Sequence, residues 1–234
     1  MNKYSKQTRI LIAVDCIIFG FDGTELKVLL IKRGMIPERG KWSLMGGFVQ
    51  PDESLDKAAN RVLLQLTGLD RVYMEQLYSF GEPERDPMER TISITYFSLL
   101  DLTKYKKQLS KEFNAEWFPL RKTPSLIFDH NKMVQLARAK LRYKASLHPV
   151  LFELLPEKFT LPQLQSLFEE VYDTVFDKRN FSRKIMSTGL LRKLQEKDKE
   201  NSKKGAYYYR LDKKNYKANF HNILRFIPNP NEFL

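Results

Sequence analysis

Runs rich in valine, isoleucine and leucine predict a β-sheet in the first half of the chain. Two of them, Ile10 to Phe21 and Leu26 to Arg33, are separated by Asp22-Gly23, a turn sequence typical of hairpins. Val72 to Phe80 and Thr91 to Leu100 are further strand candidates. We therefore expect at least four strands before residue 101.

Helical signals lie between and after these strands. Pro51 and Asp52 suit the first turn of a helix, and Gly68 suits its end. A second helix is predicted from Lys132 to Lys144, where apolar side chains recur at helical spacing at Met133, Leu136, Ala137 and Leu141. The expected fold class is α+β, with a mixed sheet between helices.

The second helix is followed by a break, which we interpret as a linker. Ser146 to Pro149 cannot continue the helical pattern, because proline ends a helix. The chain has 234 residues, 42% of them hydrophobic, which is enough for two domains. We place the boundary so that residues 1–147 form one domain and residues 148–234 the other.

The second domain has the pattern of a helix-turn-helix. Thr160 is a cap candidate for a helix with apolar residues at Leu164, Leu167, Phe168 and Val171. Asp177 is the cap candidate of the next helix, which Gly189 should end. In that helix we expect Phe181, Ile185 and Met186 to face inward and the polar residues Lys178, Arg179, Asn180, Arg183 and Lys184 to face outward.

Two strands are predicted after this helix pair. Leu190 to Leu194 and Ala206 to Leu211 have strand patterns, and the polar run Gln195 to Gly205 joins them. Two strands with a basic loop after a helix-turn-helix indicate a winged helix. In such a domain the second helix contacts DNA bases while neighbouring cations contact phosphates.

Charge supports a polyanionic partner for this second domain. The formal net charge is +12, and residues 177–217 hold fourteen basic side chains against five acidic ones, a local balance of +9. A basic surface can also serve solubility alone, so the charge has to be judged together with the winged-helix pattern. The residues expected to contact double-stranded DNA are Lys178, Arg179, Asn180, Arg183, Lys184, Lys203, Lys204 and Arg210.

Composition also limits the compartment. Cys16 is the single cysteine, so no intramolecular disulfide is possible, and we expect it to be a buried apolar residue. The basic start followed by Ile10 to Val14 is interrupted by Asp15 and is not expected to be a signal peptide. No apolar run is long enough to cross a bilayer. A cytoplasmic protein is the simplest expectation.

One motif carries chemistry. Gly47 to Glu53, followed by Arg61 and Gly68, has the skeleton of a Nudix box, and the flank Gly40 to Val49 is close to the usual entry to that box. An ordinary amphipathic helix after a glycine turn is the alternative interpretation. Three positions that hold metal-binding glutamates in a Nudix hydrolase are occupied by Val62, Gln65 and Leu66. Because Mg²⁺ takes oxygen ligands, chiefly carboxylates, we expect no catalytic residues, no metal site and no enzyme.

The chain as a whole resembles the Nudix-related transcriptional regulators, in which a degenerate Nudix domain precedes a winged helix. The residues that carry this resemblance, besides the box, are Glu84 to Arg90, Ile127 to His130, Leu154 to Pro156, Phe159 to Leu161 and Asp177 to Phe181. The resemblance implies a homodimer whose DNA affinity changes when the Nudix domain binds a metabolite. It favours a pentose such as L-arabinose as the effector, with ADP-ribose second. No cofactor is expected.

The effector-binding candidates combine aromatic platforms with polar groups near the box and the strand ends. They are Lys32, Arg33, Trp42, Phe48, Glu53, Asp86 and Arg90, and Phe80, Tyr96 and Phe128 are further aromatic candidates. For the aromatic residues, core packing is the competing explanation. Arg85, Asp86 and Arg90 are also compatible with a surface ion-pair set.

Two alternatives to a regulator stay open. A Nudix hydrolase of ADP-ribose or a nucleotide sugar would recruit Mg²⁺ through Glu53 and other carboxylates. An RNA-binding adaptor would use Tyr207 or Tyr209 to stack on bases. The missing glutamates place the hydrolase behind the regulator.

Overall fold

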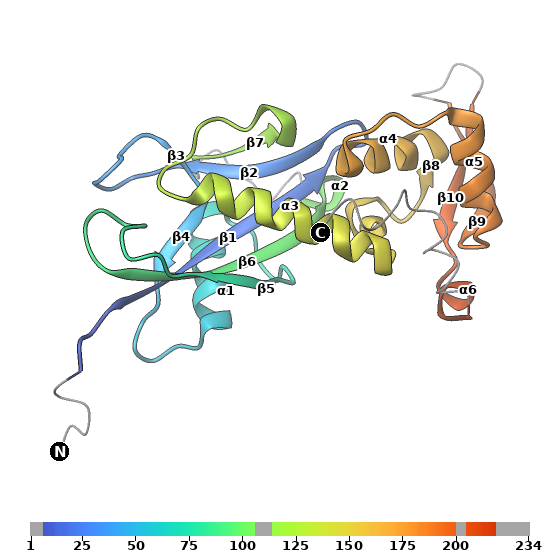
Figure 1. The fold of residues 1–234 in the computed structure, drawn as a ribbon. Coiled ribbons are helices and arrows are strands. Elements are labelled where there is room, and N and C mark those ends of the chain that lie inside the picture. The colour runs from blue at the N-terminus through green and yellow to red at the C-terminus, as the bar shows by residue number, and fades with distance from the viewer. Residues whose placement is uncertain (1–6, 106–113, 200–204, 219–234) are drawn as a thin grey trace.

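The first hairpin forms as predicted and begins a mixed sheet. The computed structural model describes residues 7–105, 114–199 and 205–218 (Figure 1). Strands β1, Leu11–Phe21, and β2, Leu26–Lys32, pair antiparallel with Phe19 opposite Val28. Asp22 Oδ1 accepts hydrogen bonds from the backbone N–H groups of Thr24 and Glu25, which closes the turn.

The sheet is completed by strands far from β1 in the sequence. β6 lies parallel to β1 along its whole length, and β5 pairs antiparallel with β6 at the edge. β3 and β7 pair with β2, and β4 pairs with β1. The bounds of these strands are Trp42–Ser43 for β3, Met45–Phe48 for β4, Glu75–Phe80 for β5, Thr91–Asp101 for β6 and Ala115–Pro119 for β7.

Helices cover both faces of this sheet. Helix α1, Leu55–Thr67, lies on one face and α3, His130–Leu147, on the other (Figure 1). Side chains alternate along a strand, so Cys16 and Ile18 of β1 pack on the side of α1, while Ile17 and Phe19 pack on the side of α3. Burial of Cys16 is thereby confirmed. The short α2, Leu102–Tyr105, lies between β6 and β7, and the 3-10 turn η1, Leu120–Lys122, lies between β7 and α3.

The start of α1 differs from the prediction. Ser54, and not Pro51 or Asp52, is the N-cap, because its side chain accepts a hydrogen bond from Lys57 N. The predicted end is confirmed, since Gly68 caps the helix with φ 75°, a left-handed conformation that suits glycine. In α3, Met133, Ala137 and Leu141 are buried as expected, but Leu136 is 37% exposed.

The second unit is a winged helix. After η2, Val150–Leu154, the helix pair α4, Leu161–Tyr172, and α5, Lys178–Ser187, packs beside a three-stranded sheet in the order β8-β10-β9. The strands are β8, Phe159–Thr160, β9, Leu191–Asp198, and β10, Ala206–Leu211, and helix α6, Lys213–Ala218, follows them. The short strand β8 was not predicted, because two residues are too few for a periodic pattern.

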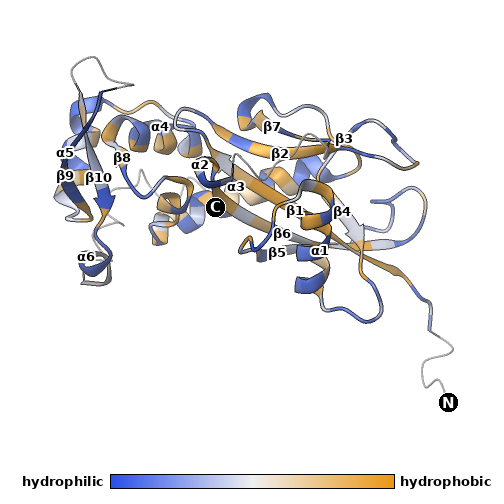
Figure 2. Ribbon diagram, turned by 180° about the vertical axis from the view of Figure 1, so that it is seen from behind, coloured by the Kyte–Doolittle hydropathy of each residue, from blue (hydrophilic) through white to orange (hydrophobic). Residues whose placement is uncertain are grey.

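The cap of α4 and most of the buried positions of α5 agree with the sequence predictions. Thr160 caps α4, and the side chain of Gln163 accepts from Thr160 N in return, which forms a capping box. Phe181 and Ile185 are buried, but Met186 is 40% exposed and does not face inward. Figure 2 shows hydrophobic residues along β1 and β6 and hydrophilic ones along β9 and much of α5.

The two units share one hydrophobic core. Phe19 and Phe21 of the sheet belong to the same buried cluster as Leu154 of η2, Leu167 of α4 and Ile185 of α5. The boundary near residue 147 stays a prediction, and the continuous core means that the two units are held together by burial of apolar surface. Within the described ranges, no helix is long and apolar enough to span a membrane.

Polar contacts join the two units at the C-terminal end of α4. Arg142 Nε of α3 donates to Val171 O at 2.6 Å, and Arg121 Nη2 of η1 donates to Glu169 O at 3.3 Å. Asp173, which follows α4 with φ 54°, lies 3.2 Å from Arg121 Nη2 and 3.6 Å from Arg138 Nη2. Arginine side chains from the first unit therefore surround the turn that leads from α4 to α5.

Candidate functional site

Glu53 and Arg61, which the chain retains from the Nudix box, hold the segment after β4 against helix α1. Arg61 donates from Nε to Glu53 Oε2 at 2.9 Å, from Nη2 to Glu53 Oε1 at 2.6 Å, and from Nη2 to Phe48 O at 2.9 Å. Glu53 Oε1 also accepts from Gln50 N. The hydrogen bonds from Arg61, followed by the bond from Gln50, lower the pKa of Glu53 to about 2. Glu53 is thus committed to an ion pair within the box.

The metal-binding positions do not fit a divalent cation. Val62 is buried, and a Cβ on Gly47 would lie 2.7 Å from its Cγ2, so the glycine allows close packing. Gln65 accepts from Arg61 Nη1 at 3.2 Å, and Leu66 is an apolar part of a pocket wall. In the part of the chain that the structure describes, no three His, Cys, Asp or Glu side chains form a metal-binding group.

A pocket of about 180 Å³ lies between β4, β1, the end of β2, the segment before β6 and the start of α3. Its buried wall contains polar side chains of Asp15, Ser43, Arg85, Thr91 and His130. Its more exposed wall includes Arg33, Gly34, Met35, Phe48, Asp86 and Phe128. The pocket therefore has a polar floor and a mixed aromatic and charged mouth.

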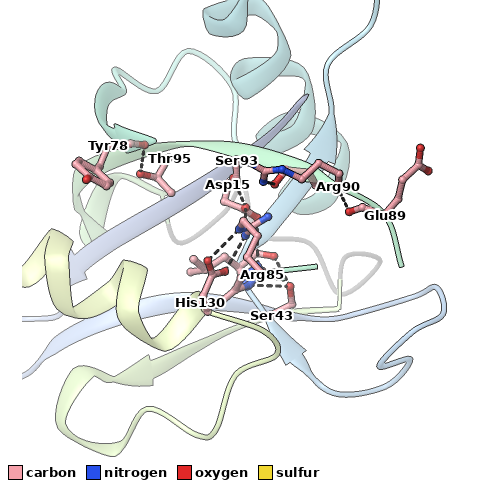
Figure 3. Close-up of polar contacts among 12 residues, drawn as sticks. Asp15, Ser43, Tyr78, Arg85, Glu89, Arg90, Ser93, Thr95 and His130 are labelled. Carbon is pink, nitrogen blue, oxygen red and sulfur yellow. Dashed lines mark hydrogen bonds and ion pairs between the residues drawn. The ribbon is translucent and has the colours of Figure 1, made fainter. Parts of the chain in front are cut away.

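Buried charges meet at the floor (Figure 3). Asp15 is 4% exposed and Arg85 is 8% exposed. Arg85 donates from Nε and Nη2 to Asp129 at 2.9 and 2.7 Å, and its Nη2 is 3.8 Å from Asp15 Oδ2. Ser93 Oγ donates to Asp15 Oδ2 at 2.5 Å. The carboxylate and the guanidinium are buried together, as buried charges in proteins generally are.

His130 is the neutral member of this cluster. Its Nδ1 accepts from the backbone N–H of Leu44 at 3.1 Å, so the ring proton of the neutral imidazole is on Nε2, 3.6 Å from Asp15 Oδ1. Burial lowers the pKa of His130, and the nearby Asp15 and Asp129 raise it by a smaller amount. The net direction is downward, so the ring is neutral near pH 7.

The structure brings three of the predicted effector residues to this pocket, namely Arg33, Phe48 and Asp86. Four others do not line it. The Lys32 amine lies 5.1 Å from the ring centre of Trp42, which packs against Phe118, and Glu53 is paired with Arg61. Arg90 donates to the backbone oxygens of Gly81 and Glu82 and holds the loop before β6.

The other aromatic candidates divide in the same way. Phe128 lines the pocket, with the Arg33 guanidinium 5.3 Å from its ring centre. Phe80 packs against the core, and Tyr96 is buried and donates from its hydroxyl to Asp56. Core packing was thus the correct interpretation for Phe80 and Tyr96.

Sequence reasoning missed the floor of the pocket. Asp15 counted only as an interruption of an apolar run, although an acid in the middle of a buried strand indicates a specific partner. The alternative that placed Arg85 in a surface ion-pair set is wrong, because Arg85 is buried and pairs with Asp129. His130 counted only as the end of the stretch Ile127 to His130, which carries the family resemblance.

The candidate DNA-contacting side chains gather on one helix. Lys178, Arg179, Asn180, Arg183 and Lys184 are all exposed on α5, while Phe181 and Ile185 bury the opposite face. Asp177 caps this helix, and Arg183 Nη2 donates to Asn180 Oδ1 at 2.8 Å. Arg210 is exposed on β10 and lies 3.4 Å from Glu157. Lys203 and Lys204 lie outside the described residues.

The tyrosines of β10 offer little to a nucleic-acid base. Tyr209 is 9% exposed and belongs to the core. The ring of Tyr207 lies beneath the amines of Lys193 and Lys197, at 3.6 and 4.5 Å. Stacking from Tyr209 is therefore excluded by its burial, and Tyr207 is the tyrosine that the RNA-adaptor alternative retains.

Comparisons with known proteins agree with this architecture. The description "NUDIX domain" matches residues 9–137, and "NrtR DNA-binding winged helix domain" matches residues 151–211. The chain is 33% identical to the "ADPR responsive transcriptional repressor NtrR" of Acinetobacter baylyi, and the similarity covers 92% of this chain and 88% of that protein. It is 34% identical to the "ADP-ribose pyrophosphatase" of Methanocaldococcus jannaschii, over 58% of this chain and 77% of that one.

Solved structures give the same result. The Shewanella oneidensis NrtR complexed with a 27mer DNA has a TM-score of 0.73 and 31% identity, covering 88% of this chain and 95% of that chain. The NUDIX domain of the same regulator, complexed with ADP ribose, has a TM-score of 0.52 and 32% identity, covering 60% and 94%. The second similarity concerns the part of the chain that contains the pocket.

The burial of neutral His130 predicts a dependence of stability on pH. In the unfolded chain this ring binds a proton near pH 6.5, and in the folded chain only at lower pH. Between these two values the unfolded state holds more protons, so the free energy of unfolding falls as the pH falls below about 6.5. Denaturant unfolding at several pH values should show a shallower dependence for His130→Gln than for wild type. The exposed residue His148, changed to Gln, is the control, and equal slopes in all three proteins would contradict the prediction.

Proposed function

The chain belongs to the Nudix-related transcriptional regulators and is a ligand-responsive DNA-binding protein with a Nudix sensor domain, and from this premise we propose that its effector is ADP-ribose. The choice of effector rests on two relatives. The repressor at 33% identity is described as ADPR responsive, and a Nudix domain at 32% identity was crystallised with ADP ribose. The pentose expected first from the sequence finds no support among these relatives.

The exposed face of α5 carries the DNA-binding part of the proposal. Three cations and an amide, Lys178, Arg179, Arg183 and Asn180, lie on the helix that follows the turn, as base-contacting residues do in a helix-turn-helix. Two such helices, one from each copy, would meet two half-sites of an approximately palindromic duplex. A homodimer in the cytoplasm is therefore part of the proposal.

A contact between the two units offers a route for coupling. Arg138 Nε and Nη2 are buried without a hydrogen-bond partner among the described residues, and Nη2 is 3.6 Å from Asp173 Oδ2. A small movement of Asp173 would close that gap to hydrogen-bond length. Because Asp173 lies in the turn before α5, such a movement would shift the DNA-contacting helix. Effector and DNA then influence each other's affinity reciprocally.

We also propose that the Nudix domain does not hydrolyse its ligand. The proposal rests on the chemistry of the box, where Val62, Gln65 and Leu66 supply no carboxylate and Glu53 is paired with Arg61. A hard cation needs several oxygen ligands, chiefly carboxylates. Hydrolysis is the second candidate function, favoured by the similarity to an ADP-ribose pyrophosphatase.

The primary test is a fluorescence-anisotropy titration of duplex DNA from the protein's own upstream region, with and without ADP-ribose or L-arabinose. We expect salt-dependent duplex binding that ADP-ribose changes. Arg179→Ala and Arg183→Ala should each weaken it by about tenfold, as loss of a base or phosphate contact does, while Lys57→Ala on α1 serves as the matched control. Sequence-blind binding that ignores both ligands would refute the regulator.

The coupling route has its own test. Asp173→Asn keeps the size of the side chain and tolerates the left-handed backbone, but it removes the charge that faces Arg121 and Arg138. We expect the effect of ADP-ribose on DNA affinity, typically between about 5-fold and 150-fold in allosteric proteins, to shrink by about fivefold. Asp70→Asn, in an exposed loop, is the control. An unchanged effect in Asp173→Asn rules out this route.

The absence of hydrolysis is tested by incubating ADP-ribose with the protein and Mg²⁺ or Mn²⁺ and separating the products by chromatography. We expect no AMP or ribose 5-phosphate above the protein-free control. Glu53→Gln resolves a positive result: turnover that this variant abolishes would establish the hydrolase, whereas turnover that it leaves unchanged comes from a contaminating enzyme.

A further inference from the structure

The hydrogen-bonding groups at the floor of the pocket are not saturated by one another. Asp15 accepts one short hydrogen bond, from Ser93. His130 Nε2 is 3.6 Å from Asp15 Oδ1, and Arg85 Nη2 is 3.8 Å from Asp15 Oδ2, both longer than the roughly 2.7–3.2 Å of a hydrogen bond. All three side chains are more than nine-tenths buried. An acceptor and two donors therefore face the same small space without bonding to each other.

The chemistry of these groups discriminates between parts of a ligand. A carboxylate only accepts hydrogen bonds, whereas a guanidinium and the protonated Nε2 of a neutral imidazole only donate. A hydroxyl group does both, so two neighbouring hydroxyls can donate to Asp15 and accept from Arg85 and His130. A phosphate only accepts and is negatively charged, so it would be repelled by buried Asp15. The floor thus suits a neutral diol and disfavours a phosphate.

The volume of the pocket also indicates that it takes one sugar ring and not a whole nucleotide. Its volume of about 180 Å³ is below the roughly 300–1,000 Å³ of sites that enclose a whole drug-sized molecule, so one ring of ADP-ribose fits inside and the rest lies at the mouth. The mouth holds the cation and aromatic ring of Arg33 and Phe128. A guanidinium there suits a pyrophosphate, and an aromatic ring suits a base or a sugar face.

We propose that Asp15, Arg85 and His130 form a subsite for the vicinal diol of a pentose ring, and that this ring is the terminal ribose of ADP-ribose. The inference rests on the proposed function for the identity of the ligand, but the diol chemistry stands on the geometry of the floor. The terminal ribose enters the floor first, and the pyrophosphate stays near Arg33. The subsite then distinguishes ADP-ribose from ADP, which has the same adenosine and phosphates without the second ring.

The test is isothermal titration calorimetry on the full chain with two ligands. One is ADP-ribose, and the other is the β-methyl ester of ADP, which keeps the pyrophosphate and its charge but lacks the second ribose. We expect the methyl ester to bind at least about tenfold more weakly, since loss of one hydrogen bond to a charged group is worth that much. Equal affinities for the two ligands would overturn the subsite, and this comparison needs only the wild-type protein.

A variant of Asp15 tests whether the difference in affinity between the two ligands arises at the floor of the pocket. Asp15→Asn should reduce the affinity for ADP-ribose by about tenfold, because the amide nitrogen replaces an acceptor with a donor, and should leave the weak binding of the methyl ester within about twofold. Asp101→Asn is the matched control, since Asp101 is 2% exposed in the same sheet but is absent from the pocket lining. An equal loss for both ligands in Asp15→Asn would contradict the assignment.

Failure of the proposed function has a different signature. If wild type binds DNA but not ADP-ribose, L-arabinose and D-ribose are titrated in its place. Binding of a free pentose that Asp15→Asn abolishes would support the diol subsite and overturn ADP-ribose as the effector. No binding of ADP-ribose or of either pentose would overturn both proposals.

Discussion

Hydrogen bonds to carbonyl oxygens in the last turn of α4 join the two units. Glu169 O already accepts from the backbone N–H of Asp173 at the helix cap, and the bond from the other unit adds to it. Arginine side chains of η1 and α3 donate to the oxygens of Glu169 and Val171. Cations at a helix C-terminus also interact favourably with its dipole. The sheet domain therefore positions α4. Because α5 follows α4 after a short turn, its position depends on that of α4. The orientation of the candidate DNA-contacting face of α5 depends on this junction.

In the proposed coupling route, the same junction would let the pocket in one unit affect a helix in the other. His130 begins α3 at the floor of the pocket, and Arg138 and Arg142 lie two and three turns further along that helix, against the end of α4. A helix transmits displacement along its axis because its backbone hydrogen bonds keep it stiff. The shared core of Phe21, Leu154 and Leu167 removes the freedom that a flexible linker would give.

Much of this architecture follows from local sequence. The hairpin at Asp22, the cap at Thr160 and the inward face of Phe181 each depend on a few neighbouring residues, and the sequence predicts them. The floor of the pocket does not follow in this way. Its hydrogen bonds between side chains join residues separated by 44 to 87 positions, and only the tertiary fold brings them together. Arg33, Phe48 and Asp86 were found because they lie in or near loops around the box.

The two glycines of β4, Gly46 and Gly47, occupy positions where a side chain has no space. A Cβ on Gly46 would lie 2.3 Å from Asp15 Oδ1, and one on Gly47 would lie 2.7 Å from Val62 Cγ2. Both glycines are thus required by the packing of the pocket floor and of α1, whether or not a metal binds. A motif search that gives weight to these glycines would class the chain with pyrophosphatases. Sorting sensors from hydrolases on this scaffold therefore calls for scoring the helix carboxylates separately from the loop.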